Sequence, residues 1–146
     1  MVRRPVAFAT ALVLFVEAVG IVVLNGVLAT VVGNQNMSLA GMDPDAMVTG
    51  TWVMGGVSGA LLLLCGLIPL LAGLRDRAPG RFARIGLIMC AVAHAVLGAL
   101  AVGLIGWAAF VFLMAALGLI VLTLVVFERH EPDTGRAGAR GAQAPV

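Results

Sequence analysis

The chain contains four long apolar segments joined by short connections, of which the first two are polar. The apolar segments cover residues 5–32, 47–74, 85–104 and 107–127. Each reaches the roughly 20 residues that an α-helix needs to cross about 30 Å of hydrocarbon. Because lipid offers no hydrogen-bond partner to a backbone amide, this pattern predicts helices. The expected fold class is all-α, a membrane-spanning four-helix bundle formed by residues 1–130.

Composition supports a membrane environment. Of the 146 residues, 62% are hydrophobic and only 11% are charged, whereas a soluble domain carries about a quarter charged residues. The exception is the segment 131–146, which is rich in Gly, Ala and Pro and has no apolar periodicity. We expect this segment to be a disordered cytoplasmic tail.

The basic residues predict how the chain is oriented. All of them are arginines, and all nine fall on the same side of the predicted spans: Arg3, Arg4, Arg75, Arg77, Arg81, Arg84, Arg129, Arg136 and Arg140. Since cytoplasmic loops carry the excess of positive charge, both termini are expected in the cytoplasm, an N-in/C-in arrangement in a bacterial cytoplasmic (inner) membrane. Trp52 and Trp107 fall near the opposite interface, which indole rings favour.

The polar loop before the second segment ends in Asp43-Pro44-Asp45. Asp43 suits an N-cap, Pro44 the first helical position and Asp45 the positive end of the helix dipole. The sequence therefore predicts the start of a helix here. An outer cation site made by the two carboxylates is the alternative interpretation.

Small residues predict where the helices approach one another, because without bulky side chains the backbones can pack closely in lipid. Pro69, inside the second segment, is expected to kink it. Rows of small residues along a helix are compatible with a monomeric bundle, with a homodimer and with a larger membrane complex. The candidate packing residues are Gly55, Gly59, Gly66, Gly73, Ala95 and Ala99.

Glu17 and His94 are the most informative polar residues within the apolar segments. Glu17 lies 13 residues after Arg4, roughly 20 Å along a helix, and His94 lies ten residues after Arg84, roughly 15 Å along. The two residues are therefore expected at similar depth, although the sequence does not settle whether they touch. Thr10 shares the helix face of Glu17 at seven-residue spacing, while Asn25 points elsewhere.

Three interpretations of this pair of residues stay open. In the first, Glu17 and His94 form a polar clamp that fixes the register of the helices. In the second, Glu17 is a buried carboxylate that exchanges protons, with His94 able to relay them. A role toward a ligand or a partner is the third.

No motif in the sequence points to an enzyme. There is no nucleophile–base pair, phosphate-binding loop or zinc-like Cys/His cluster. We therefore expect the lipid bilayer as a partner, but no metal, cofactor or nucleic acid. Cys65 and Cys90 are interpreted as small apolar packing residues. A membrane enzyme that uses His94 is the least favoured hypothesis.

Two resemblances accompany this interpretation. Val16-Glu17-Ala18-Val19-Gly20 resembles the first-helix pattern of small multidrug resistance transporters, which implies a homodimer exchanging cations for protons through Glu17. The segment 43–52 and the Arg75–Phe82 turn resemble uncharacterised four-helix membrane proteins of actinobacteria, which implies no activity. We predict a non-enzymatic scaffold or accessory subunit, with a proton-coupled exporter as the alternative.

Overall fold

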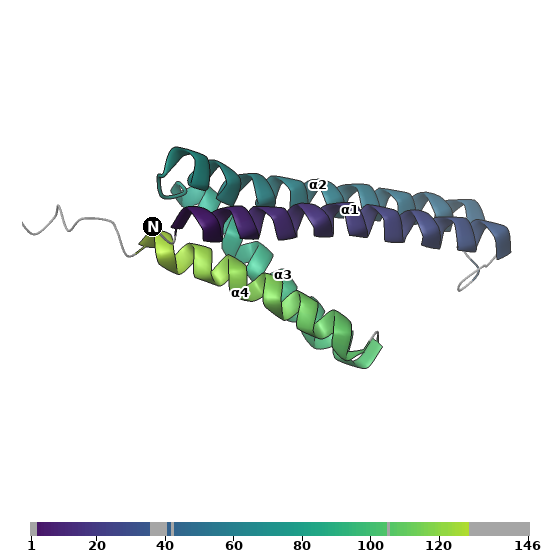
Figure 1. Cartoon of the computed structure of the whole chain (residues 1–146). Coiled ribbons are helices and arrows are strands. Elements are labelled where there is room, and N and C mark those ends of the chain that lie inside the picture. Colours follow the sequence, from purple (N-terminus) through teal and green to yellow (C-terminus); the bar gives the residue numbers. More distant parts are fainter. Residues whose placement is uncertain (1–2, 36–40, 42, 105, 129–146) are drawn as a thin grey trace, which may run out of the picture.

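The computed structural model describes residues 3–35, 41, 43–104 and 106–128, and it folds them into four helices (Figure 1). These are α1 (Arg3–Gln35), α2 (Pro44–Arg75), α3 (Arg81–Leu104) and α4 (Trp107–Glu128). The predicted all-α fold with four helices is thus confirmed for this part of the chain. Each helix is long and apolar enough to cross a membrane. The tail expected to be disordered, 131–146, lies outside the described residues.

The start of α2 follows the capping chemistry of its sequence. Asp43 is the N-cap in an extended conformation, Pro44 follows at the first helical position, and the Asp43 carboxylate accepts a hydrogen bond from the Asp45 amide at 2.8 Å. The predicted helix start is therefore confirmed. At the other end, Asp76 closes the helix in the left-handed region with a φ of 50°. The helix is continuous across Pro69, whose ring is buried.

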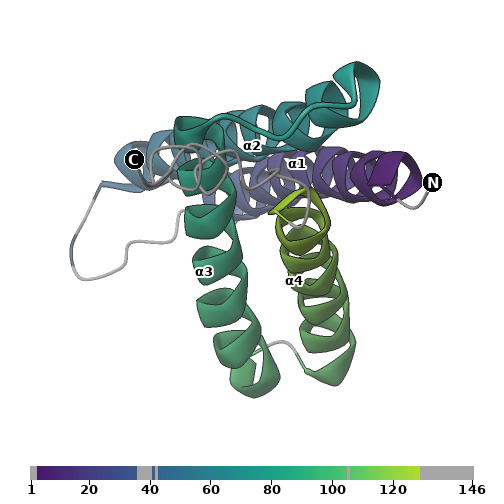
Figure 2. The same cartoon turned by 90° about the vertical axis from the view of Figure 1, so that its left-hand side faces the viewer.

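The helices form two antiparallel hairpins, α1–α2 and α3–α4 (Figures 1 and 2). Glycines of α2 let α1 approach closely along most of its length. A Cβ atom at Gly59 would lie 2.5 Å from Val22 Cγ2, and one at Gly73 would lie 3.2 Å from Ala7 Cβ. Gly55 and Gly66 face Asn25 and Phe15 in the same way. We call these four glycines the glycine seam.

The packing face of α3 differs from the expected one. Its buried residues include Leu87, His94 and Ala101, which recur at seven-residue spacing, whereas Ala95 and Ala99 are exposed. The seam expected at Ala95 and Ala99 is therefore not the one that α3 uses within this chain. His94 requires a polar partner inside the bundle, and a residue one position further along a helix points about 100° away.

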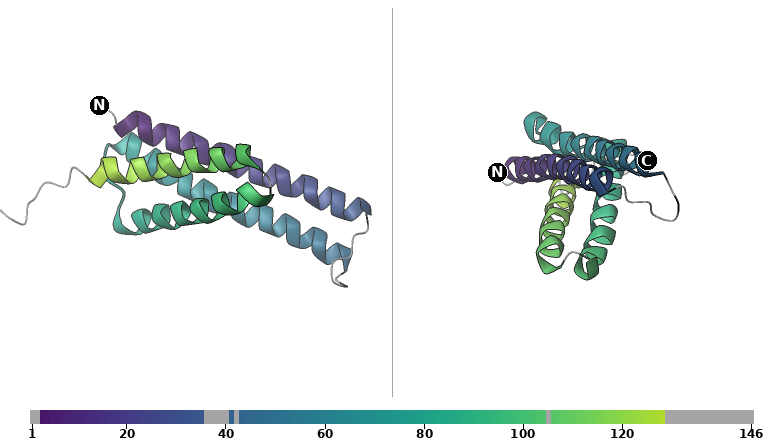
Figure 3. Two further views of the ribbon diagram at one scale, coloured as in Figure 1. Left: turned by 90° about the horizontal axis from the view of Figure 1, so that it is seen from below. Right: turned by 90° about the vertical axis from the view of Figure 1, so that its right-hand side faces the viewer.

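One end of the molecule, which we call the arginine end, gathers the start of α1, the loop between α2 and α3, and the end of α4 (Figure 3). It carries Arg3, Arg4, Arg75, Arg77, Arg81 and Arg84.

The core lies in the half of the bundle near the arginine end. Leu14, Leu87 and Ile120 from three helices meet there and are at most 1% exposed. Further along α1, on the face that carries Leu14 and Glu17, Leu24 is 52% exposed and Leu28 is 47% exposed. The hairpins therefore pack together near the arginine end and diverge beyond it (Figure 1).

Candidate functional site

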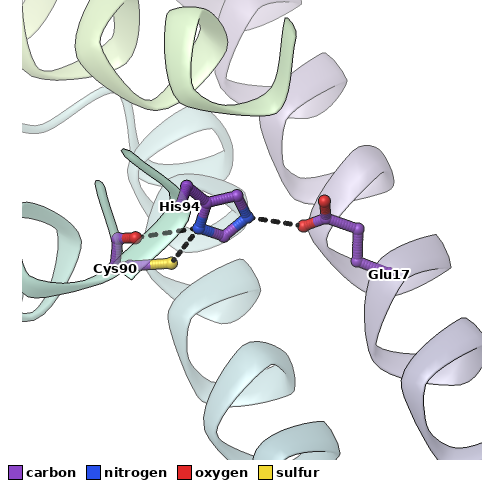
Figure 4. Close-up of polar contacts among 3 residues, drawn as sticks. All are labelled: Glu17, Cys90 and His94. Atoms are coloured by element: carbon purple, nitrogen blue, oxygen red, sulfur yellow. Dashed lines mark hydrogen bonds and ion pairs between the residues drawn. The ribbon is translucent and has the colours of Figure 1, made fainter. Parts of the chain in front are cut away.

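Glu17 of α1 and His94 of α3 meet between the two hairpins (Figure 4). The Glu17 Oε2 and His94 Nε2 atoms are 2.8 Å apart, and the side chains are only 7% and 5% exposed. Both residues come from the inward faces of their helices, where Leu14 and Leu87 are also buried. The structure therefore brings together the two polar residues that the sequence placed at similar depth.

The second ring nitrogen of His94 is held by its own helix. His94 Nδ1 lies 2.8 Å from the backbone carbonyl oxygen of Cys90 and 3.6 Å from the Cys90 sulfur (Figure 4). A carbonyl oxygen only accepts hydrogen bonds, so Nδ1–H is the donor. This bond fixes the ring orientation and leaves Nε2 for Glu17.

The tautomer determines what the pair can do chemically. With Nδ1 protonated, a neutral His94 accepts a hydrogen bond at Nε2 from a protonated Glu17, and an imidazolium donates one to a carboxylate. One proton therefore lies between Oε2 and Nε2 in either form, and the pair has no net charge. Without that proton, the lone pair of His94 Nε2 would face a carboxylate oxygen at 2.8 Å, and the two atoms would repel each other.

The remaining oxygen of Glu17 is unusual. Oε1 is buried and has no hydrogen-bond partner among the described residues. Buried polar atoms are nearly always hydrogen-bonded, and leaving one unsatisfied costs about 1–3 kcal/mol. Both ring nitrogens of His94 therefore have hydrogen-bond partners, whereas only one oxygen of the Glu17 carboxyl group has a partner among the described residues.

A second polar contact joins α1 to α4. The hydroxyl oxygens of Thr10 and Thr123 are 2.8 Å apart, and the Leu119 carbonyl oxygen lies 3.1 Å from Thr10 Oγ1 and 2.9 Å from Thr123 Oγ1. Thr10 therefore contacts Thr123 rather than Glu17. Sequence reasoning missed this role of Thr123, although the residue is the only polar one between Trp107 and Phe127.

Asn25 does not belong to the Glu17–His94 site. Its amide donates to the Ile21 carbonyl oxygen at 2.8 Å, and its Cβ atom faces Gly55 of α2. This placement agrees with the expectation that Asn25 points toward a different neighbour than Glu17 does. Asn25 thus belongs to the contact between α1 and α2.

The arginine end contains contacts that the sequence interpretation did not assign. Arg84 at the start of α3 forms an ion pair with Glu128 at the end of α4. Arg4 Nε donates to the Gly73 carbonyl oxygen at 3.1 Å and so joins the start of α1 to the end of α2. The opposite charges of Arg84 and Glu128 at adjoining ends of an antiparallel helix pair are a signal that could have predicted their contact.

The cysteines lie beside the site without forming a disulfide. Cys90 is buried, Cys65 is half-buried, and both are free thiols. Cys65 packs against the core cluster that contains Cys90. Within the ranges that the structure describes, no group of three or more His, Cys, Asp or Glu side chains is arranged to hold a metal ion.

No protein-family model matches the chain, and comparisons with curated proteins and with solved structures give no match either.

Proposed function

We propose that this chain is a small non-enzymatic multi-pass protein of the bacterial cytoplasmic membrane that acts as a scaffold or accessory subunit. The supporting observation is that two pairs of buried polar side chains join its helices. Glu17–His94 joins α1 to α3, and Thr10–Thr123 joins α1 to α4. Both pairs occur where the two hairpins pack together.

The energetics fit a clamp. A carboxylate near the middle of a membrane span costs about 2.5–3.5 kcal/mol on insertion scales, so Glu17 needs a partner. Interhelical hydrogen bonds in membranes contribute about 0.6 kcal/mol on average. Pairs of this kind therefore specify which helix faces meet more than they stabilise the fold. A rigid and defined bundle surface is what an accessory subunit requires.

The proposed orientation follows from charge. The six arginines that the structure describes lie at one end of the bundle, and the remaining three follow α4 in the sequence. With positive charge retained in the cytoplasm, the arginine end faces inward and both termini lie in the cytoplasm.

The scaffold proposal is tested by isolating the tagged full chain from its native membrane in a mild detergent. An accessory subunit should co-migrate with a second membrane protein at a fixed ratio through size exclusion. A tagged four-span membrane protein of unrelated sequence, prepared in parallel, controls for detergent-induced association. Recovery of the free protein alone would count against the accessory role.

A specific observation keeps a second candidate, a proton-coupled small-molecule exporter acting as a homodimer through Glu17. The Oε1 atom of Glu17 is buried without a partner among the described residues, and the Glu17–His94 pair lies close to where the hairpins begin to diverge. Exchange of the shared proton for a cationic substrate at Oε1 would couple the two fluxes.

Glu17→Gln separates the two functions, because glutamine can still hydrogen-bond to His94 but cannot ionise. Purified protein in liposomes is given a proton gradient and tetraphenylphosphonium, one lipophilic cation probe. A pH-sensitive dye inside the liposomes records the proton flux that accompanies uptake of the probe. An exporter should lose coupled flux in Glu17→Gln and keep it in the control Thr10→Val. Equal traces for wild type and both variants would support the scaffold.

A further inference from the structure

A depression with a volume of about 300 Å³ opens at the arginine end between the end of α2, the following loop and the start of α3. Its walls differ in chemistry. Ile68, Leu71 and Ala72 line the part that follows α2 into the apolar span, and Arg75 and Arg77 lie at the part formed by the helix end and the loop. The depression is therefore apolar along the span and basic at its mouth.

The two arginines at the mouth are available to bind an anion. The ion pairs among the described residues are Arg84–Glu128 and Glu17–His94, so Arg75 and Arg77 have no carboxylate partner within that part of the chain. Both side chains are exposed. One acidic residue, Asp76, lies between them in the sequence, and the local balance remains positive.

The helices α2 and α3, which border the depression, make few contacts with each other. These two helices contact each other less than α1 contacts α4 and far less than α1 contacts α2. Ile68, in the wall of the depression, also faces Gly86 of α3, where a Cβ atom would lie 3.5 Å from its Cδ1. A molecule bound in the depression would fill space between α2 and α3 that protein side chains leave unfilled.

We propose that this depression binds one anionic phospholipid, with its phosphate held by Arg75 and Arg77 and an acyl chain along Ile68 and Leu71. Guanidinium groups bind phosphate oxygens through two parallel hydrogen bonds. The apolar wall favours a lipid over free phosphate, because an inorganic ion would leave that wall without a partner. The proposal uses the orientation given above, which places this end at the anionic inner leaflet, and is independent of the scaffold role.

The test measures lipid binding by the purified full chain in dodecyl maltoside with native mass spectrometry. Dioleoylphosphatidylglycerol should bind at one molecule per chain, and dioleoylphosphatidylcholine should bind much less. The double variant Arg75→Gln/Arg77→Gln should bind phosphatidylglycerol at least about tenfold more weakly, since each basic residue near an anionic lipid surface contributes about 1 kcal/mol. The control, Arg136→Gln/Arg140→Gln, removes the same charge elsewhere and should retain binding.

A second variant tests the cavity without changing charge. Ala83 lines the depression and is half-buried, so Ala83→Phe should fill the space and reduce phosphatidylglycerol binding. Phosphatidylglycerol should also raise the thermal unfolding midpoint of the wild type, whereas millimolar inorganic phosphate should not. Equal loss in the control pair, unchanged binding in Ala83→Phe, or equal stabilisation by phosphate alone would each overturn the proposal.

Discussion

Among the residues that the structure describes, the carboxyl group of Glu17 has one hydrogen-bond partner, His94, and this determines what its substitutions should do. We expect Glu17→Gln to change stability little, because the new amide can donate to His94 Nε2. Glu17→Ala should cost about 1–3 kcal/mol, since it leaves that buried nitrogen unpaired. The free energy of unfolding in mixed detergent micelles is the measurement.

Removing both partners provides the control for this prediction. Glu17→Leu/His94→Leu should recover most of the stability that Glu17→Ala loses, because no unsatisfied atom remains at His94. If Glu17→Gln were as destabilising as Glu17→Ala, a hydrogen bond to His94 would not be what holds α1 and α3 in register.

The Thr10–Thr123 contact predicts a smaller and separable effect. Thr10→Val and Thr123→Val should each cost about 0.6 kcal/mol, and the double variant should cost less than their sum, because both remove the same contact. Combined with Glu17→Gln, the effects should add, since no contact joins the two pairs. Additive single threonine effects, measured in the same unfolding assay, would contradict a shared bond.

Sequence reasoning recovered part of this chemistry. Counting residues from Arg4 and Arg84 placed Glu17 and His94 at similar depth, because the rise per residue of a helix is fixed. Their contact was not predictable, since depth does not specify which helices are neighbours. The contact between Thr123 and Thr10 was not predictable, because a hydroxyl that can bond to the carbonyl oxygen four residues back gives no sign of a second partner.

At the scale of elements, the close approach of α1 predicts a contrast between Gly59, which belongs to the glycine seam, and Gly56, which does not. A Cβ atom at Gly59 would lie 2.5 Å from Val22 Cγ2 and 3.3 Å from the Ala18 backbone oxygen, whereas one at Gly56 would meet nothing within 4 Å. Gly59→Ala should therefore destabilise the α1–α2 hairpin by about 1–3 kcal/mol, since a stiff valine and a backbone atom must both move. Gly56→Ala should be neutral or slightly stabilising.

Gly98 supplies a second comparison for the same unfolding measurement. A Cβ atom there would lie 2.4 Å from Met114 Cε, the end of a flexible side chain that can move aside. Gly98→Ala should therefore cost less than Gly59→Ala despite the similar distance. Equal losses at Gly56 and Gly59 would show that the close approach of α1 is not what makes Gly59→Ala destabilising.

Small residues indicated where α2 packs but not where α3 does. The glycines of α2 have no side chain, so a contact at them needs only a neighbouring helix. Ala95 and Ala99 are small too, yet α3 turns His94 inward because lipid offers its ring no hydrogen-bond partner, and Leu87 lies on the same face. The divergence of the hairpins could not be read from such stripes, since small residues allow contact without specifying its extent.

For the whole molecule, helix length and hairpin divergence are related. The helices α1 and α2 have 33 and 32 residues, whereas α3 and α4 have 24 and 22. At 1.5 Å per residue, the first hairpin is about 50 Å long and the second about 35 Å, against roughly 30 Å of hydrocarbon. Because the hairpins diverge (Figure 2), α1–α2 can tilt strongly in a bilayer while α3–α4 stays nearly upright.

Val27, whose side chain is 57% exposed on the protein surface, should contact lipid if the α1–α2 hairpin tilts and water if the hairpin projects from the bilayer. Val27 lies about 35 Å along α1 from Arg4. An upright α1 would carry it beyond the hydrocarbon, whereas a tilt of about 40° keeps it within lipid. In a Cys65→Ala/Cys90→Ala background, we expect Val27→Cys to resist a membrane-impermeant maleimide, while Asn34→Cys and the control Leu104→Cys react. Rapid labelling at Val27 would show that α1–α2 projects into water instead, and the divergence of the hairpins would then need a cause other than helix length.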